Sequence, residues 1–479
     1  MPKRYKDFKL RIVKMPPPGP GMEASACMQI VEAPDHETTS VSIYLQPDAP
    51  TLRKIALLGT EGNELTDFGH AFFQQLFEPH HVRPLYNRVR GIIDQDPDVG
   101  LRIQVIPQNM ASAEVDPSQD SFQHMPWEYL YDPDQQRFLA LDPDRVSLVR
   151  SSPNAGRCRQ IPTRPPVRVL TVLANPRVGA KYRIDVGRER QLIEQAVEQA
   201  GLTAVIGLPD NRDDQVSGVE VIITHLDQLP DAQGQPQKAS RVALKRYFRD
   251  RPRPHILYVS CHGSYDDTTR EGVLVLEKNP QSGNEQGQQD KLAARELKNW
   301  LTDLAPHLRL VIFNACSTAP TREVAAFKSI AEAAVQAGVP AVIAMQFDIP
   351  LDVAQVFTLG FCTQLFKACL KEGRPIDLAL ARAREEILAY APLYKPHWGI
   401  PVLYRHPSGL EPFQMAPPGQ WERARNLMDE LFFNRQQRKS LLMLRDSGSG
   451  FPSLSEDLAR IEQNIERLEG ELKGIFEGS

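Results

Sequence analysis

Two apolar stretches, HILYVSCHG at residues 255–263 and LRLVIFNACST at residues 308–318, decide the fold class of this 479-residue chain. Each is a short, continuous run of apolar and β-branched residues, which is typical of a strand buried on both faces of a parallel sheet. Similar runs, among them VRVLTVLA, VLVLE, VPAVIAMQ and IPVLY, alternate with helical segments between residues 167 and 404. This order predicts an α/β fold in which a doubly wound sheet carries helices on both faces.

Both stretches end in residues that can carry chemistry. The first ends in His262 and Gly263, and the second contains Cys316. Ligands and reacting groups of doubly wound sheets lie at the carboxyl ends of the strands. If the two strands are neighbours, the imidazole can take the proton of the thiol and create the nucleophilic thiolate. We therefore predict a catalytic pair of His262 and Cys316, with the backbone N–H groups of Gly263 and Cys316 as the oxyanion hole.

These residue types also have structural interpretations. A lone cysteine in an apolar segment is usually part of the core, as we expect for Cys261, Cys362 and Cys369. A single histidine at the end of a strand is often a hydrogen-bonded structural residue. The six cysteines show no CxxC spacing, so the sequence indicates neither a disulfide framework nor a metal site, and we expect no cofactor.

The overall composition is that of a globular protein. Charged residues make up 24% of the chain and the net charge is −4, which gives no reason to expect direct nucleic-acid binding. No secretory signal and no apolar run long enough to span a bilayer is present, so we expect a soluble, cytoplasmic protein without membrane contact. The charged strings at residues 246–254 and 426–439 are expected to be solvated faces, although a local basic patch stays open.

The pattern of apolar runs and helical segments divides the chain into three predicted parts. Residues 1–160 form a mixed α/β accessory region, residues 161–408 form the main α/β domain, and residues 409–479 form a helical tail. In the tail, leucine and isoleucine recur in alternating steps of four and three, which is a short heptad pattern. The segment 453–476 is therefore either an amphipathic helix docked on a neighbouring helix or a helix that contacts another protein.

The motifs of the chain resemble those of the CHAT family, a branch of the caspase-like clan that also contains separases. The His262-to-Cys316 spacing is close to the roughly 50 residues of caspases, although the local caspase signature around the cysteine is missing. The resemblance rests on YVSCHGSYDD (258–267), LRLVIFNACST (308–318), SIAEAAVQAGVPAVIAMQFDIP (329–350), GRPIDLALARAREEILAY (373–390) and HWGIPVLY (397–404), and more weakly on TDFGHAFFQQLF (66–77) and HMPWEYLYDPDQQRFLALDPDRVSLVR (124–150).

This resemblance implies a caspase-like α/β/α sandwich with a pseudo-caspase-like N-terminal region and a C-terminal helical appendage. It also implies a cysteine endopeptidase that cuts a protein substrate with His262 and Cys316. Members of the family commonly act in bacterial defence or regulated death and stay latent until a protein partner activates them. The alternative is a catalytically idle scaffold that works by protein–protein recruitment.

The resemblance does not decide which residues form S1, the pocket that receives the P1 side chain. Asn314 stands two residues before the cysteine, where metacaspase-like relatives have an acidic residue. Asp348 resembles the acidic S1 position of separases, so we hypothesise that it receives a P1 Arg or Lys, with Asp352 as the substitute candidate. The structural alternative for Asp348 is a cap of the next helix. The polar loop 279–290 is either a surface insertion or a processing or gating segment.

Overall fold

The computed structural model describes most of the chain, and at several positions, Cys316 among them, it describes the backbone alone. The described residues are 4–14, 26–33, 39–43, 49–78, 82–109, 125–158, 161–176, 184–207, 218–231, 234–266, 268–278, 289–317, 323–408, 411–415, 417, 419–446 and 454–477. The predicted loop therefore lies outside them at residues 279–288, whereas Gln289 and Asp290 begin a strand.

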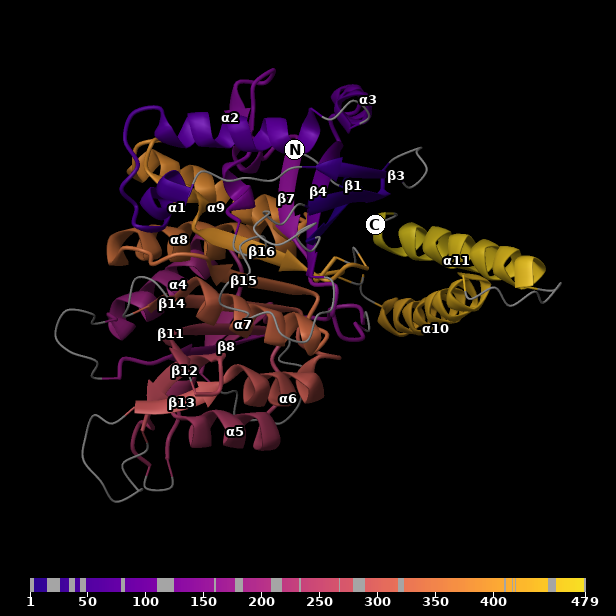
Figure 1. Ribbon diagram of the computed structural model, residues 1–479. Coiled ribbons are helices and arrows are strands. Elements are labelled where there is room, and N and C mark those ends of the chain that lie inside the picture. The colour runs from indigo at the N-terminus through magenta and orange to yellow at the C-terminus, as the bar shows by residue number, and fades with distance from the viewer. Residues whose placement is uncertain are drawn as a thin grey trace.

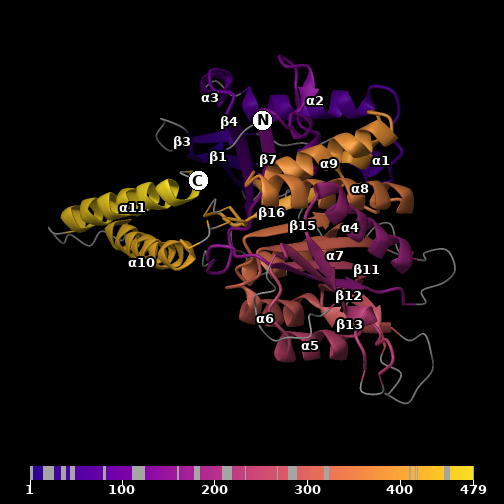
Figure 2. The same cartoon turned by 180° about the vertical axis from the view of Figure 1, so that it is seen from behind.

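Within the described residues, a single 14-stranded sheet runs through the body of the molecule (Figures 1 and 2). Its main path follows the order β3-β2-β1-β4-β7-β16-β15-β14-β11-β8-β10-β9, with β12 and β13 attached beside β11. The strands, including the separate β5–β6 pair, are β1 (Arg4–Lys14), β2 (Ala26–Glu32), β3 (Thr39–Ile43), β4 (Val99–Asn109), β5 (Tyr131–Asp132), β6 (Arg137–Phe138), β7 (Val146–Arg150), β8 (Val167–Leu173), β9 (Ala204–Ile206), β10 (Val221–His225), β11 (Ile256–Asp266), β12 (Glu271–Glu277), β13 (Gln289–Ala293), β14 (Leu310–Ser317), β15 (Ala341–Met345) and β16 (Pro401–Arg405).

Helices cover both faces of this sheet, as the alternating pattern predicts. In the C-terminal half, α4, α8 and α9 pack on one face and α5, α6 and α7 on the other. The helices are α1 (Ala49–Ala56), α2 (Glu64–Phe77), α3 (Val82–Asp94), α4 (Val186–Ala200), α5 (Arg241–Asp250), α6 (Ala294–Leu304), α7 (Glu323–Gln336), α8 (Leu351–Gln364, continued as a π-helical turn over Leu365–Lys371), α9 (Ile376–Tyr390), α10 (Trp421–Asp446) and α11 (Leu454–Glu477).

Among the described strands of the sheet, five pairs are antiparallel and depart from the parallel arrangement that the apolar runs indicate: β1–β2, β2–β3, β11–β12, β12–β13 and β15–β16. β12 is antiparallel to β11 because only four residues separate the two strands, and a connection of that length cannot cross back to the other edge of the sheet. β13 is in turn antiparallel to β12. β16 is antiparallel to β15 because α8 and α9 form a helical hairpin between them. Two antiparallel helices return the chain to the edge that it left, so the next strand runs backwards.

The strand β1 was not predicted. Its side chains alternate between Phe8, Leu10 and Ile12, which are fully buried, and polar residues that are partly exposed. β1 pairs in parallel with β4 along its whole length, and it therefore extends the sheet of the main domain into the N-terminal region. The α/β/α fold class and the helical appendage are confirmed, whereas the predicted domain boundaries at residues 160 and 408 stay predictions.

The C-terminal helices α10 and α11 form a hairpin that lies beside the body of the molecule (Figures 1 and 2). Leu468, Leu472 and Ile475 of α11 pack against Leu427 and Leu431 of α10, among others. The heptad pattern thus serves packing within one chain, as the first of the two interpretations expects. A contact with another protein through residues 453–476 stays a prediction.

One helix among the described residues, Leu351–Lys371, meets the length and composition of a membrane span. In this structure 61% of its apolar window is buried inside the protein. The helix packs against α4 and α9 and contributes Phe357 and Phe361 to the core. Its apolar character is therefore that of a core helix.

A buried ion network joins the two halves of the sheet, where β7 and β16 share a single register pair, Tyr404 with Arg150. Asp377 on α9 accepts hydrogen bonds from Arg102 Nε at 2.8 Å and from Arg405 Nη1 at 2.9 Å. Ser147 Oγ on β7 donates to the same carboxylate at 2.7 Å. Burial alone would raise the pKa of Asp377, but the two guanidinium groups outweigh it and lower the pKa.

We predict that Asp377→Ala lowers the free energy of unfolding by about 3–5 kcal/mol, because it leaves two buried guanidinium groups with the partly exposed Glu411 as their one remaining shared anion. Asp144→Ala is the matched control, since Asp144 pairs with Arg382 at the surface, and it should cost less than about 1 kcal/mol. Urea unfolding at neutral pH measures both values. Equal losses for the two variants would contradict a special role of the buried network.

Candidate active site

The strands β11 and β14 are parallel neighbours in the centre of the sheet, and their register pairs His262 with Cys316. The same ladder pairs Ser260 with Asn314 and Gly263 with Ser317. Register partners on parallel strands lie at the same height and on the same face of a sheet. The structure therefore brings the two predicted catalytic positions together at the carboxyl edge.

His262 is buried, with 2% of its surface exposed. It lies between two strands, because Val275 of the antiparallel β12 is its register partner on the other side. Along β11, Ile256 and Tyr258 alternate with residues of the opposite face, and both belong to the core beneath α4 and α8. By this alternation, the His262 position faces the layer of α4 and α8.

A buried polar cluster lies on that face, directly before the predicted catalytic positions. Its centre is Glu189 Oε1 on α4, which accepts hydrogen bonds from the Tyr258 hydroxyl, from Asn314 Nδ2 at 2.8 Å and from Thr358 Oγ1 at 2.9 Å. Asn314 Nδ2 also contacts the hydroxyls of Tyr258 at 3.0 Å and Thr358 at 3.1 Å. The cluster thus ties α4 and α8 to β11 and β14 within four residues of His262 and two of Cys316.

The buried environment of Glu189 favours the protonated, neutral form of its carboxyl group. Burial raises the pKa of this carboxyl, and the hydrogen bonds from Tyr258, Asn314 and Thr358 offset only part of the rise. Sequence reasoning missed this residue. A signal was present, since Glu189 stands on the apolar stripe of its helix, in line with Leu192, Ile193 and Ala196.

The three S1 candidates are placed on different elements. The Asn314 amide group is held in the polar cluster. Asp352, in the first turn of α8, is exposed and accepts a hydrogen bond from the Tyr390 hydroxyl at 2.5 Å. Asp348 is partly buried in the segment between β15 and α8. Asn314 and Asp352 are thus engaged in separate hydrogen bonds, and the S1 assignment stays a prediction, as does the oxyanion hole at Gly263 and Cys316.

The remaining cysteines agree with core packing. Cys261, Cys362 and Cys369 are all buried, and burial raises the pKa of Cys362 well above its ordinary value. Among the described residues, no group of three or more His, Cys, Asp or Glu side chains is placed to hold a metal ion.

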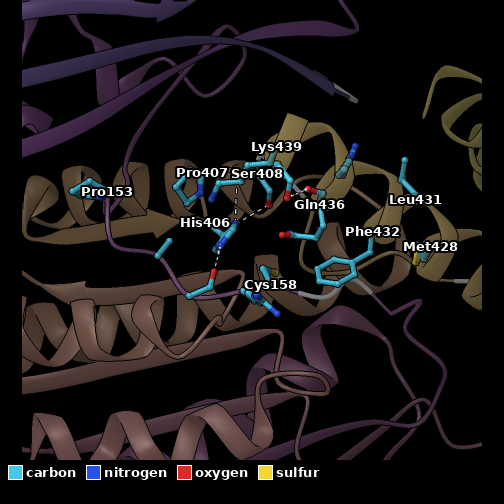
Figure 3. Close-up of a pocket in the computed structure, with 15 residues that line it drawn as sticks. Pro153, Cys158, His406, Pro407, Ser408, Met428, Leu431, Phe432, Gln436 and Lys439 are labelled. Atoms are coloured by element: carbon cyan, nitrogen blue, oxygen red, sulfur yellow. Dashed lines mark hydrogen bonds between the residues drawn. The ribbon is translucent and has the colours of Figure 1, made fainter. Parts of the chain in front are cut away.

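A cavity of about 690 Å³ lies apart from the paired strands, between α10 and the loops that follow β7 and β16 (Figure 3). His406 lies in its wall, with Nε2 2.7 Å from the Gly156 carbonyl oxygen and Nδ1 2.8 Å from Ser408 Oγ. The loop after β16 begins beside the amino end of β15, because the His406 N–H donates to the Pro340 carbonyl oxygen. This cavity is therefore at the opposite edge from His262 and contains none of the predicted site residues.

The raised pKa of Glu189 predicts a pH-dependent stability. A carboxyl whose pKa is higher in the fold than in the unfolded chain stabilises the fold at low pH, and this contribution is lost as pH rises above about 4.3. We expect the unfolding free energy of the Glu189→Gln variant to rise relative to that of the wild type as the pH increases from 5 to 8. Urea unfolding at several pH values measures this difference.

Two further variants control this prediction. Glu198→Gln changes an exposed glutamate on the same helix and should leave the pH dependence of the wild type unchanged. Glu189→Ala removes the acceptor of three buried donors and should cost about 3 kcal/mol at pH 5. A wild type and a Glu189→Gln variant with parallel pH profiles would contradict the raised pKa.

Among solved structures, the chain is similar to the Arg-specific cysteine proteinase gingipain R (RgpB), with 12% identity and a TM-score of 0.36 over 73% of this chain and 68% of that chain. It is also similar to the complex of the pro- and mature domains of Porphyromonas gingivalis RgpB, with 11% identity and a TM-score of 0.35 over 69% and 71% of the two chains.

A search of curated proteins gives no match. The family model described as the CHAT domain matches residues 114–404, and the predicted resemblance is thereby confirmed. Because this match spans more than half of the chain, the protein belongs to the CHAT domain family.

Proposed function

We propose that the protein is a cysteine endopeptidase in which Cys316 is the nucleophile and His262 the general base. The register of β11 and β14, which pairs these two positions on neighbouring parallel strands, is the observation that carries the proposal. A histidine and a cysteine that the backbone register pairs on neighbouring strands are the residue types that thiol catalysis uses.

The proposed reaction proceeds through an acyl-enzyme. The imidazole of His262 takes the proton of the Cys316 thiol, and the thiolate attacks the carbonyl carbon of the scissile peptide bond. The backbone N–H groups of Gly263 and Cys316 donate to the oxyanion. The imidazolium then protonates the leaving amine, and water, activated by the imidazole, hydrolyses the thioester and restores the enzyme. The proposed reaction uses no cofactor.

The proposed substrate is a specific protein, and the proposed setting is a bacterial defence or regulated-death pathway in the cytoplasm. We further propose that the enzyme is latent and that a protein partner activates it. Both statements follow from the resemblance to the family. The second candidate function, an idle scaffold that recruits other proteins, keeps the same fold, and it differs in the reactivity of Cys316.

In the activated enzyme, we expect Cys316 to react with an iodoacetamide-type probe much faster than an ordinary thiol, since a neighbouring imidazole lowers the pKa of the thiol. His262→Ala should reduce the rate of labelling at Cys316 by about 100-fold or more. Mass spectrometry of the labelled peptide gives the rate and the site.

Cys261→Ala is the matched control, because Cys261 is adjacent to His262 in the chain and fully buried on β11. This variant should keep the wild-type rate of labelling. A scaffold would give a different result: Cys316 would react no faster than a free thiol and His262→Ala would change nothing.

The S1 proposal makes Asp348 the residue that receives a P1 Arg or Lys. Removal of a carboxylate that pairs with a charged substrate group should lower kcat/KM by about 10- to 100-fold. We therefore expect Asp348→Ala to lose this much on fluorogenic peptides with P1 Arg or Lys, while the probe labels Cys316 as before. Asp352→Ala should leave kcat/KM nearly unchanged, because that carboxylate is bonded to Tyr390. Indifference of the wild type to a basic P1 would remove the proposal.

A further inference from the structure

A groove of about 690 Å³ lies between α5 and α6. These two helices cover the face of the sheet opposite to the His262 position; Figure 1 labels both helices. Residues of both helices and of the segment that follows α5 form its walls. These residues are Val242, Lys245, Arg246, Phe248, Arg249, Arg253, Trp300, Asp303 and Leu304.

The groove carries a positive charge that the fold leaves largely uncompensated. Four of its lining residues are basic and Asp303 alone is acidic. Arg249 binds its neighbour Asp250, at 2.6 Å. In the part of the chain that the structure describes, Lys245, Arg246 and Arg253 make no ion pair.

This charge is local. The 13 residues from Arg241 to Arg253 contain six basic residues and one acidic residue, whereas the whole chain has a net charge of −4. Arg241 is already neutralised, because its guanidinium group binds Glu296 on α6 at 2.6 Å. The other cations of the segment are exposed. The solvated face that the sequence predicted here is therefore also a concave, cationic surface.

Apolar and aromatic side chains interrupt the cations. Phe248 and Trp300 are half-buried, and their rings meet edge to face with centroids 6.4 Å apart. Lys245 Nζ lies 6.0 Å from the centre of the Trp300 ring. Val242 is 51% exposed at the rim. Aromatic and arginine side chains in a concave patch are the types that supply most of the binding energy at protein interfaces.

We propose that the α5–α6 groove binds a short acidic segment of a partner protein and seats an apolar side chain of that segment against Phe248 and Trp300. Guanidinium groups bind carboxylates in a planar, two-pronged geometry, and Lys245, Arg246 and Arg253 supply the charge. A nucleic acid fits less well, because the net negative charge of the chain opposes a long polyanion and three unpaired cations neutralise few phosphates.

The sheet separates this surface from the catalytic positions. Leu257 and Val259 of β11 belong to the core beneath α5 and α6, whereas Tyr258 and the His262 position belong to the other face. A partner in the groove therefore does not have to cover the face on which the catalytic positions lie. The proposal concerns binding alone and does not depend on peptidase activity.

A selection from a library of random 12-residue peptides, displayed on phage and presented to the full chain, tests the ligand chemistry. We expect the selected peptides to be rich in Asp and Glu and to share one aromatic or aliphatic residue. The same selection on the triple variant Lys245→Glu, Arg246→Glu and Arg253→Glu should lose this preference. Identical peptides from both proteins, or peptides without acidic residues, would overturn the proposal.

Fluorescence polarisation with the best acidic peptide then measures the affinity. The triple variant should bind about tenfold more weakly or worse, and Trp300→Ala should bind several-fold more weakly. The matched control reverses three exposed cations elsewhere, Arg188→Glu, Lys367→Glu and Lys439→Glu, and should retain the wild-type affinity. Equal losses of affinity in both triple variants would show that net charge alone causes the effect, and this would contradict a specific site in the groove. Tighter binding of a fluorescent oligo(dT) than of the peptide would replace the proposal by a nucleic-acid site.

Discussion

The carboxylate of Asp377 is the anion on which the junction of the molecule depends. The two halves of the sheet meet at β7 and β16, where the backbone ladder has one register pair. Side chains replace the missing ladder: Arg102 comes from the N-terminal half, Arg405 from β16, and both bind Asp377 on α9. Buried guanidinium groups are tolerated only with a partner anion, so the network fixes which strands can be neighbours here.

A second network extends this constraint toward the candidate site. Arg150 on β7 donates to Glu128 and, at 2.8 Å, to Gln346 Oε1. Gln346 Nε2 in turn donates to the Gly399 carbonyl oxygen at 2.6 Å. Gln346 directly follows β15 and stands two residues before Asp348. The N-terminal half thus anchors the segment that carries the main S1 candidate, which gives that half a structural role beside the proposed site.

The sequence predicted the elements whose signal is local. Buried strands such as β14 and β15 are continuous apolar runs, so the bounds predicted for them were close to the observed ones. β1 was missed because only every second residue is apolar and its basic residues hide the alternation. The pairing of β16 with β7 has no local signal, since the two strands lie about 250 residues apart in the sequence; the Ser151 hydroxyl, for example, donates to the Arg405 carbonyl oxygen.

In the candidate site, too, some features have a local signal in the sequence and others arise only in the fold. The spacing and the strand ends of His262 and Cys316 are visible in the sequence, and the register of β11 and β14 pairs these positions. The cluster of Glu189, Tyr258, Asn314 and Thr358 is not visible in this way, because its members come from four elements that meet only in the fold. One misplaced polar residue on an apolar stripe, Glu189, was the available sign that such partners exist.

The two faces of the sheet place different demands on the same strands. Beneath α4 and α8, the polar cluster and the His262 position require donors and acceptors that are matched across four elements. Beneath α5 and α6, the described side chains that β11 and β14 add to the core are apolar, such as Val259 and Phe313. An apolar contact layer tolerates substitution better than a buried polar network, in which one lost partner leaves the others unsatisfied. The outer surfaces of α5 and α6 are therefore free to diverge toward a partner without disturbing the face that holds the proposed catalytic positions.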